Sequence, residues 1–298
     1  MKKNNKQVLV IGSGTMGSGI AHTFAQYHFP VFLYDTNIHA LDNALQKITT
    51  NVERQIIKGS IHVSDKQTIL KRITPTSDLK LATQNCVLVI EAVPESLDIK
   101  QNVFKLIDEL CPEETILSSN TSSISITQLA GFTNRPDKVI GMHFMNPVPI
   151  MPLIEIVNGT QTRKATTDYI IQMSKAIGKI PVCTVDSPGF ISNRILMPMI
   201  NEAIHALQEG VAGIAEIDQI MKLGMSHPMG PLELADYIGL DVCLHIMEVL
   251  YTGFGNAKYA PCPLLVKMVH AGFLGHKTKK GFYDWTDPKN LVTNDIIR

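Results

Sequence analysis

The stretch of sequence that decides the fold runs from Val8 to Asp35 and reads VLVIGSGTMGSGIAHTFAQYHFPVFLYD. It opens with a short apolar run and continues with a glycine motif of the form G-x-G-x-x-G. A helical segment from Met16 to about Tyr27 follows, and a second apolar run closes the stretch. This order of strand, glycine turn, helix and strand is the context that a dinucleotide-binding βαβ unit requires. The motif consists of Gly12, Ser13, Gly14, Thr15, Met16 and Gly17.

The glycine motif predicts a nucleotide site because each glycine has a physical task. Gly12 permits a tight turn, Gly14 lets the backbone approach a pyrophosphate, and Gly17 allows close packing of helix on strand. The N-terminus of the helix presents free N–H groups and the positive end of its dipole to the phosphates. Asp35, eighteen residues after Gly17, would accept hydrogen bonds from ribose hydroxyls and repel a 2′-phosphate. We therefore expect NAD rather than NADP; the alternative is a glycine-rich turn without a ligand.

Short apolar runs rich in β-branched residues recur along the first two thirds of the chain, and helical patterns separate most of them. Buried runs that alternate with helices predict a parallel sheet covered on both faces. After Asp186-Ser187-Pro188-Gly189 the pattern becomes helical. We expect a Rossmann-type α/β domain over residues 1–187, with a mostly parallel sheet and a helical insertion. An all-α domain is expected over residues 188–298.

The composition argues against several classes of protein. Lys plus Arg and Asp plus Glu number 27 each, and the resulting net charge of zero argues against nucleic acid as the main partner. Five cysteines, an odd number without a C-x-x-C pair, argue against a disulfide framework and a zinc site, so we expect no metal. No apolar run approaches the ~18 residues that cross a bilayer. We expect a cytoplasmic protein without a membrane partner.

Two polar residues near the carboxyl ends of predicted strands are candidates for the chemistry, because ligands of open parallel sheets bind at that edge. His143 is the one histidine of ten that follows a predicted sheet strand there. Glu155 lies inside the apolar run Leu153–Val157, where an unpaired carboxylate would be costly. The proline-rich loop between them can fold back, so we infer a His143–Glu155 pair that fixes the imidazole tautomer. The alternative is a surface glutamate and a capping histidine.

A carboxylate-supported histidine beside an NAD site predicts the dehydrogenation of an alcohol. The imidazole would remove the hydroxyl proton while hydride leaves for the nicotinamide. Zinc is not needed when a histidine acts as the base.

The long connection between Asp35 and Val87 begins with an amphipathic helix. Its apolar face contains Leu41, Leu45, Ile48, Val52 and Ile56. Its opposite face carries Lys47, Arg54 and Lys58. These cations either form an ordinary solvated face or receive an anionic ligand.

Several further segments, distributed over the chain, extend the pattern beyond the glycine motif. They read VIEAVPESLDIKQNVF, SSNTSSISIT, VIGMHFMNPVPIMPLIEIV, DSPGFISNRILMPMINEA, HPMGPLELADYIGLDV and HKTKKGFYDW. With these segments the whole chain resembles the L-3-hydroxyacyl-CoA dehydrogenase family, and within it the short bacterial 3-hydroxybutyryl-CoA dehydrogenases. The resemblance implies NAD-dependent, reversible oxidation of a short-chain (S)-3-hydroxyacyl-CoA to the 3-oxoacyl-CoA, in fatty acid or butyrate metabolism.

The resemblance also implies roles for individual residues. The family's catalytic histidine and glutamate fall on His143 and Glu155, which agrees with the inference from the residues alone. Its substrate-contacting residues fall on Ser122, Asn146 and Asn193. Coenzyme A phosphates become the expected ligand of Lys47, Arg54 and Lys58. Beyond the glycine motif, the family's cofactor contacts fall on Asp35, Glu95, Lys100, Ser122, Asn146 and Lys277.

Two positions depart from the family's usual pattern. Met145 replaces a common phenylalanine and Pro152 replaces a common lysine, which bears on acyl chain length but not on the reaction class. The resemblance implies a homodimer formed through the helical domain. Two alternatives remain: a CoA-free hydroxy-acid dehydrogenase of the lambda-crystallin type, and a non-catalytic NAD-binding protein on the same fold.

Overall fold

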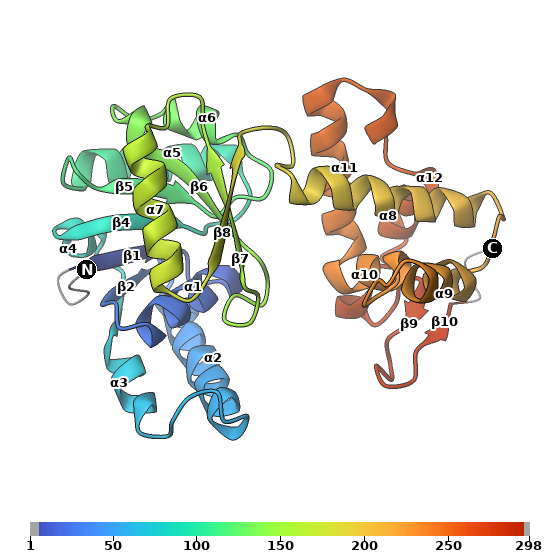
Figure 1. The fold of residues 1–298 in the computed structure, drawn as a ribbon, viewed down its shortest axis with the longest axis horizontal. Helices are drawn as coiled ribbons and strands as arrows, with labels where there is room; N and C mark the ends of the chain where they lie inside the picture. Colours follow the sequence, from blue (N-terminus) through green and yellow to red (C-terminus); the bar gives the residue numbers. More distant parts are fainter. Residues whose placement is uncertain (1–5, 295–298) are drawn as a thin grey trace. The chain divides into compact units, whose positions relative to one another are not determined.

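The computed structural model describes residues 6–294 and divides into two compact units (Figure 1). One unit ends at Ser187 and the other begins at Pro188. Each unit has a hydrophobic core of its own. No helix in the described range is both long and apolar enough to cross a membrane.

Up to Ser187, the described chain contains one eight-stranded sheet with the order β3-β2-β1-β4-β5-β6-β7-β8. Its strands are β1 (Gln7–Ile11), β2 (Val31–Tyr34), β3 (Ile73–Thr76), β4 (Cys86–Glu91), β5 (Ile116–Ser119), β6 (Val139–Phe144), β7 (Leu153–Asn158) and β8 (Ile180–Val185). The strands from β3 to β6 are parallel, whereas β7 runs antiparallel to β6 and β8 runs parallel to β7. The predicted mostly parallel sheet is confirmed. The sequence did not indicate β3, because Pro75 interrupts its pattern; an edge strand tolerates proline.

Helices cover both faces of the sheet (Figure 1). They are α1 (Thr15–Gln26), α2 (Ile38–Ile57), α3 (Asp65–Lys71), α4 (Leu79–Thr83), α5 (Leu97–Leu110), α6 (Ile126–Ala130), the 3₁₀ turn η2 (Pro136–Lys138) and α7 (Lys164–Ala176). Residues of α1 and α7 share one core with alternate residues of the strands, while α5 and α6 pack on the opposite face. This arrangement leaves the carboxyl ends of the parallel strands free to carry the polar residues named above.

The α2–α3 pair is the predicted helical insertion between β2 and β3. Asn37 caps α2, since its side chain accepts hydrogen bonds from the N–H groups of His39 and Ala40. The predicted apolar face is confirmed: Leu41, Ile48 and Val52 are buried, and the other two residues of that face are half-buried. The cations Lys47, Arg54 and Lys58 are exposed.

The second unit is helical, as expected, with one addition. Its elements are α8 (Ser192–Gln208), α9 (Ile214–Gly224), α10 (Pro231–Ile238), α11 (Leu240–Phe254), η3 (Ala257–Tyr259), α12 (Pro263–His270), η4 (His276–Thr278), β9 (Tyr283–Asp284) and β10 (Val292–Thr293). The antiparallel β9–β10 pair makes the expectation of an all-α domain incomplete. Its start is fixed by the buried carboxylate of Asp236, which accepts hydrogen bonds from the N–H groups of Phe282 and Tyr283 and from the indole of Trp285.

Candidate active site

The glycine turn between β1 and α1 is built as the motif predicts. Gly12 has a φ of +95°, and a Cβ there would lie 2.6 Å from the carbonyl oxygen of Ala92. A Cβ on Gly17 would overlap the carbonyl oxygen of Gly12, so α1 can approach the turn only without a side chain at this position. At Gly14, in contrast, a Cβ would meet no atom within 4 Å. The turn is therefore closely packed against the protein at Gly12 and Gly17, and it has open space at Gly14.

The start of α1 suits an anionic group. Gly14 is the N-cap and provides no side-chain hydrogen bond, and the first turn of this described helix holds no acidic residue. The backbone N–H groups and the positive end of the helix dipole thus have no side-chain anion from the cap or the first turn. A pyrophosphate fits this donor set.

Asp35, at the end of β2, is held as an anion beside the turn. Its Oδ2 accepts hydrogen bonds from the N–H and the hydroxyl of Ser13, both at 2.8 Å, and its Oδ1 accepts one from Asn37 N–H at 3.0 Å. Partial burial tends to raise the pKa of Asp35, but these hydrogen bonds outweigh it and lower the pKa below its ordinary value. The carboxylate is charged at neutral pH.

A pocket of about 780 Å³ adjoins the turn and Asp35. It is lined by Gly12, Gly14, Thr15, Met16 and Asp35, and by apolar side chains of the β4–α5 region such as Val93, Ile99 and Leu106. An anion-binding helix end, an acidic residue and an apolar wall are the parts that a dinucleotide with a flat adenine ring requires. The residues present therefore fit NAD.

The antiparallel pairing of β6 and β7 brings His143 and Glu155 together. The two residues are directly opposite each other in the register, so their side chains lie on one face of the sheet. The Nδ1 of His143 is 3.0 Å from the Oε2 of Glu155, and both residues are buried. With Glu155 accepting from Nδ1–H, the Nε2 atom carries the lone pair of the neutral imidazole.

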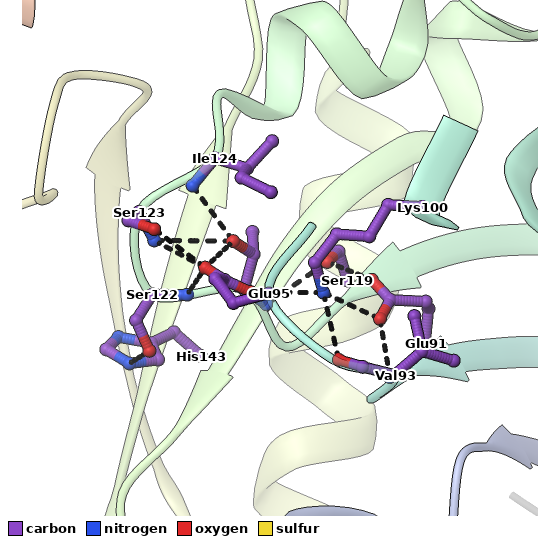
Figure 2. Close-up of polar contacts among 10 residues, drawn as sticks. Glu91, Val93, Glu95, Lys100, Ser119, Ser122, Ser123, Ile124 and His143 are labelled. Carbon is purple, nitrogen blue, oxygen red and sulfur yellow. Dashed lines mark hydrogen bonds and ion pairs between the residues drawn. The ribbon is translucent and has the colours of Figure 1, made fainter. Parts of the chain in front are cut away.

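Ser122 approaches the other side of the same imidazole. It lies in the turn after β5, and its Oγ is 3.1 Å from the Nε2 of His143 (Figure 2). Ser122, His143 and Glu155 thus form a chain of side chains in which one end is a hydroxyl and the other a carboxylate. This geometry places a proton-accepting nitrogen beside a hydroxyl, as general-base chemistry requires.

The predicted cofactor contacts Glu95 and Lys100 lie beside this turn and are joined to it. Glu95 Oε1 accepts hydrogen bonds from Thr121 Oγ1 and from the N–H groups of Ser122 and Ser123, at 3.0 and 3.1 Å for the latter two. Its Oε2 is 3.2 Å from the Nζ of Lys100. Figure 2 shows this network and its connection to His143.

Glu91, to which the sequence pattern assigned no role, completes the network. Glu91 is fully buried at the end of β4, and its Oε1 is 2.7 Å from the Nζ of Lys100. The signal that could have revealed it is the one that revealed Glu155, a carboxylate inside an apolar strand.

A second pocket, of about 630 Å³, lies between α1, α2 and the loop of residues 145–152. Lys47 and Arg54 line it together with Asn146, which is exposed on the loop. The predicted cationic face and the predicted substrate residue Asn146 therefore share one pocket. Lys58 follows the last residue of α2 and is not among the lining residues.

A buried lysine, Lys179, holds the loop of residues 145–152 through its backbone. The Nζ of Lys179 donates to the carbonyl oxygens of Val148 at 2.5 Å and Met151 at 2.7 Å. Burial lowers the pKa of Lys179. Two hydrogen bonds from Lys179 to backbone carbonyls, together with the prolines of the loop, therefore hold this wall of the pocket in place.

Two predicted site residues belong to the second unit. Asn193 lies in the first turn of α8, after the turn that contains Gly189. Lys277 lies in η4, and its Nζ is 2.6 Å from the Oδ2 of Asp241. Their roles toward substrate and cofactor stay predictions.

Comparison with protein families assigns both units. Residues 7–187 match the model described as 3-hydroxyacyl-CoA dehydrogenase, NAD binding domain. Residues 189–285 match the model described as 3-hydroxyacyl-CoA dehydrogenase, C-terminal domain.

Individual relatives match over nearly the whole chain. A 3-hydroxybutyryl-CoA dehydrogenase of Clostridioides difficile is 52% identical over 279 residues, which cover 94% of this chain and 99% of the relative. A probable 3-hydroxybutyryl-CoA dehydrogenase of Bacillus subtilis is 49% identical over 282 residues, with 95% and 98% coverage. The crystal structure of (S)-3-hydroxybutyryl-CoA dehydrogenase from Ralstonia eutropha is 45% identical with a TM-score of 0.92, and the match covers 95% of this chain and 100% of that one.

Proposed function

The chain belongs to the 3-hydroxyacyl-CoA dehydrogenase family, and we propose that it interconverts (S)-3-hydroxybutyryl-CoA and acetoacetyl-CoA. It is an NAD-dependent oxidoreductase, as the resemblance predicted. The observation that carries the proposal is the Ser122–His143–Glu155 chain, in the same unit as the NAD fingerprint. The four-carbon substrate is taken from the relatives with about 50% identity.

His143 acts as the general base of the oxidation. Its Nε2 takes the proton of the substrate's 3-hydroxyl, and in the reverse direction Nε2–H returns the proton to the carbonyl oxygen. When bound, NAD would supply the hydride acceptor for this reaction. Glu155 keeps the Nδ1–H of His143 oriented and stabilises the positive imidazolium that forms. Ser122 is placed to hydrogen-bond the reacting oxygen, since its hydroxyl already lies within 3.1 Å of Nε2.

The cofactor would be held by the glycine turn and Asp35. The α1 N-terminus would receive the pyrophosphate, and the charged Asp35 would accept from the ribose hydroxyls and repel a 2′-phosphate. Glu95, Lys100, Ser122, Asn146 and Lys277 are proposed as further contacts of the cofactor.

The CoA portion of the substrate would occupy the pocket between α1, α2 and residues 145–152. Lys47 and Arg54 supply positive charge for phosphates there. Neutralising both, as Lys47→Gln and Arg54→Gln, is expected to raise KM for acetoacetyl-CoA at least tenfold with little change in kcat. Lys71→Gln, an exposed lysine on α3, is the matched control. An unchanged KM would favour a substrate without CoA.

Homodimer formation through the second unit is also part of the proposal. Exposed apolar side chains gather on and around α9, where Ile220, Leu223 and Met225 are all more than half exposed. Such a patch favours association with a second copy. Analytical ultracentrifugation should show a dimer; a monomer at all concentrations would refute it.

The cytoplasm is proposed as the location because five cysteines without a disulfide spacing suit a reducing compartment.

The direct test is the consumption of NADH with acetoacetyl-CoA. We expect turnover by the wild-type enzyme, much weaker turnover with NADPH, and a loss of kcat of at least a thousandfold in His143→Ala. The exposed His270→Ala is the matched control. An inactive wild type, or a His143→Ala variant with near-normal kcat, would overturn the assignment.

A further inference from the structure

We propose that Glu91 is a positioning residue for the reaction, which acts through Lys100 and Glu95 to fix the Ser122 turn beside His143. The inference rests on the proposed function of the Ser122–His143 pair. Glu91 is not one of the proposed ligand contacts; it touches Lys100, which is, so its effect on catalysis would be indirect. The network runs from the buried carboxylate of Glu91 to the imidazole of His143 (Figure 2).

The buried end of the network is the carboxylate of Glu91. Three donors surround it: Lys100 Nζ at 2.7 Å and Val93 N–H at 2.7 Å on Oε1, and Ser119 Oγ at 2.5 Å on Oε2. Burial raises the pKa of Glu91, against the opposing effects of the Lys100 ammonium and these hydrogen bonds. A fully buried acid with this many donors has a fixed position.

Lys100 transmits that position to a second carboxylate. It lies in the first turn of α5 and its side chain is only 1% exposed. Its Nζ is shared between Glu91 Oε1 at 2.7 Å and Glu95 Oε2 at 3.2 Å, with the carbonyl oxygen of Val93 at 3.4 Å. An ammonium removed from water must be compensated by such partners, so the lysine holds Glu95 at a defined place.

Because Lys100 holds Glu95 in place, the hydrogen bonds that Glu95 accepts fix the conformation of the turn after β5. Its Oε1 accepts hydrogen bonds from two consecutive N–H groups, those of Ser122 and Ser123, and from the hydroxyls of Thr121 and Ser123. Burial tends to raise the pKa of Glu95, but Lys100 and the hydroxyl groups outweigh it and lower the pKa. Four donors on one anionic oxygen leave the turn little freedom.

The fixed turn sets the distance that matters for the chemistry. Ser122 gives its N–H to Glu95 and has its Oγ 3.1 Å from His143 Nε2, so one residue joins the network to the imidazole. A shift of the turn by about an ångström would break that contact and lower the rate by orders of magnitude. The charges of Glu91 and Lys100 therefore affect the reaction rate indirectly, because they fix the position of the neutral Ser122 hydroxyl.

The test is a double-mutant cycle read by the single-turnover rate of NADH oxidation with acetoacetyl-CoA. Glu91→Gln keeps the shape of the side chain but removes its charge. We expect it to lower the rate about tenfold in the wild-type background and less than twofold in the Ser122→Ala background. The KM for acetoacetyl-CoA should change less than threefold. Glu109→Gln, an exposed glutamate on α5, is the matched control.

A general weakening of the fold would lower the rate by the same factor in both backgrounds, and that result overturns the proposal. A Glu91→Gln rate within twofold of wild type overturns it as well. If Glu91→Gln does not fold, Ser119→Ala, which removes the hydroxyl that donates to Glu91 Oε2, enters the same cycle under the same criterion. Failure of the proposed function is distinguishable, because it would show as an inactive wild type or an active His143→Ala.

Discussion

The charge of Glu155 should be worth at least an order of magnitude in rate, and Glu155→Gln tests this directly. The substitution keeps the size of the side chain and its ability to accept a hydrogen bond. It removes the negative charge 3.0 Å from the Nδ1 of His143, in a place where both residues are buried. The ground state, with a neutral imidazole, loses little. The transition state, in which the imidazole becomes positive, loses a charge-assisted hydrogen bond.

The magnitude follows from that one hydrogen bond. Hydrogen bonds to charged groups contribute about 1.5–3 kcal/mol, and each loss of about 1.4 kcal/mol lowers a rate tenfold. We expect kcat to fall about 10- to 100-fold from the lost charge. A further loss follows if the glutamine amide donates to Nδ1, because the imidazole would then carry its proton on Nε2 and could not act as the base.

The assay is the steady-state oxidation of (S)-3-hydroxybutyryl-CoA by NAD, the direction in which His143 acts as the base, followed by NADH absorbance at several concentrations of each substrate. The exposed Glu109→Gln loses the same charge far from the imidazole and should match the wild type. Thermal unfolding of Glu155→Gln identifies any loss of folded enzyme. A kcat within threefold of wild type, or a loss found only in KM, would refute the role of the carboxylate.

Three further predictions follow from the first unit. Asp35→Asn should raise the ratio of kcat/KM for NADPH over NADH by about tenfold, or about 1.4 kcal/mol, because the repelling charge is lost. Gly17→Ala should lower the free energy of unfolding by more than about 2 kcal/mol in urea titrations, since its methyl group overlaps the Gly12 carbonyl, whereas Gly14→Ala should keep the stability and weaken NADH binding. Burial lowers the pKa of His22 from 6.5 to about 4, so the unfolded chain binds a proton between these pH values and the folded chain does not. Stability should therefore fall by about 2 kcal/mol from pH 7 to pH 5, and His22→Leu should abolish that part of the fall in urea titrations at both pH values.

The parts of the fold that depend on local sequence could be predicted, and those that depend on tertiary partners could not. The βαβ unit follows from glycines whose tasks are local, and the amphipathic α2 follows from its own periodicity. β3 contains Pro75 and is recognisable only from its pairing with β2 at the sheet edge. The β9–β10 pair depends on Asp236, which lies more than forty residues earlier in the chain.

The same division applies to the candidate site. Glu155 could be found because a carboxylate in an apolar strand needs a partner, and the prolines indicated that the chain turns back toward His143. The link from Glu91 to Ser122 could not be found, because it crosses β4, α5 and the turn after β5 in three dimensions. The pocket location of Lys47 and Arg54 agrees with the predicted cationic face.

The antiparallel ladder of β6 and β7 has a consequence for how this scaffold can diversify. His143 and Glu155 face each other because of the register of β6 and β7, two buried strands whose hydrophobic pattern specifies how they pair. The loop of residues 145–152 forms a wall of the pocket between α1 and α2. Insertions or substitutions in the loop can therefore remodel the pocket proposed for the CoA portion while the proton-transfer pair stays in place. The pocket wall and the proton-transfer pair lie on different segments of the backbone. The wall can therefore change during evolution while the pair is kept.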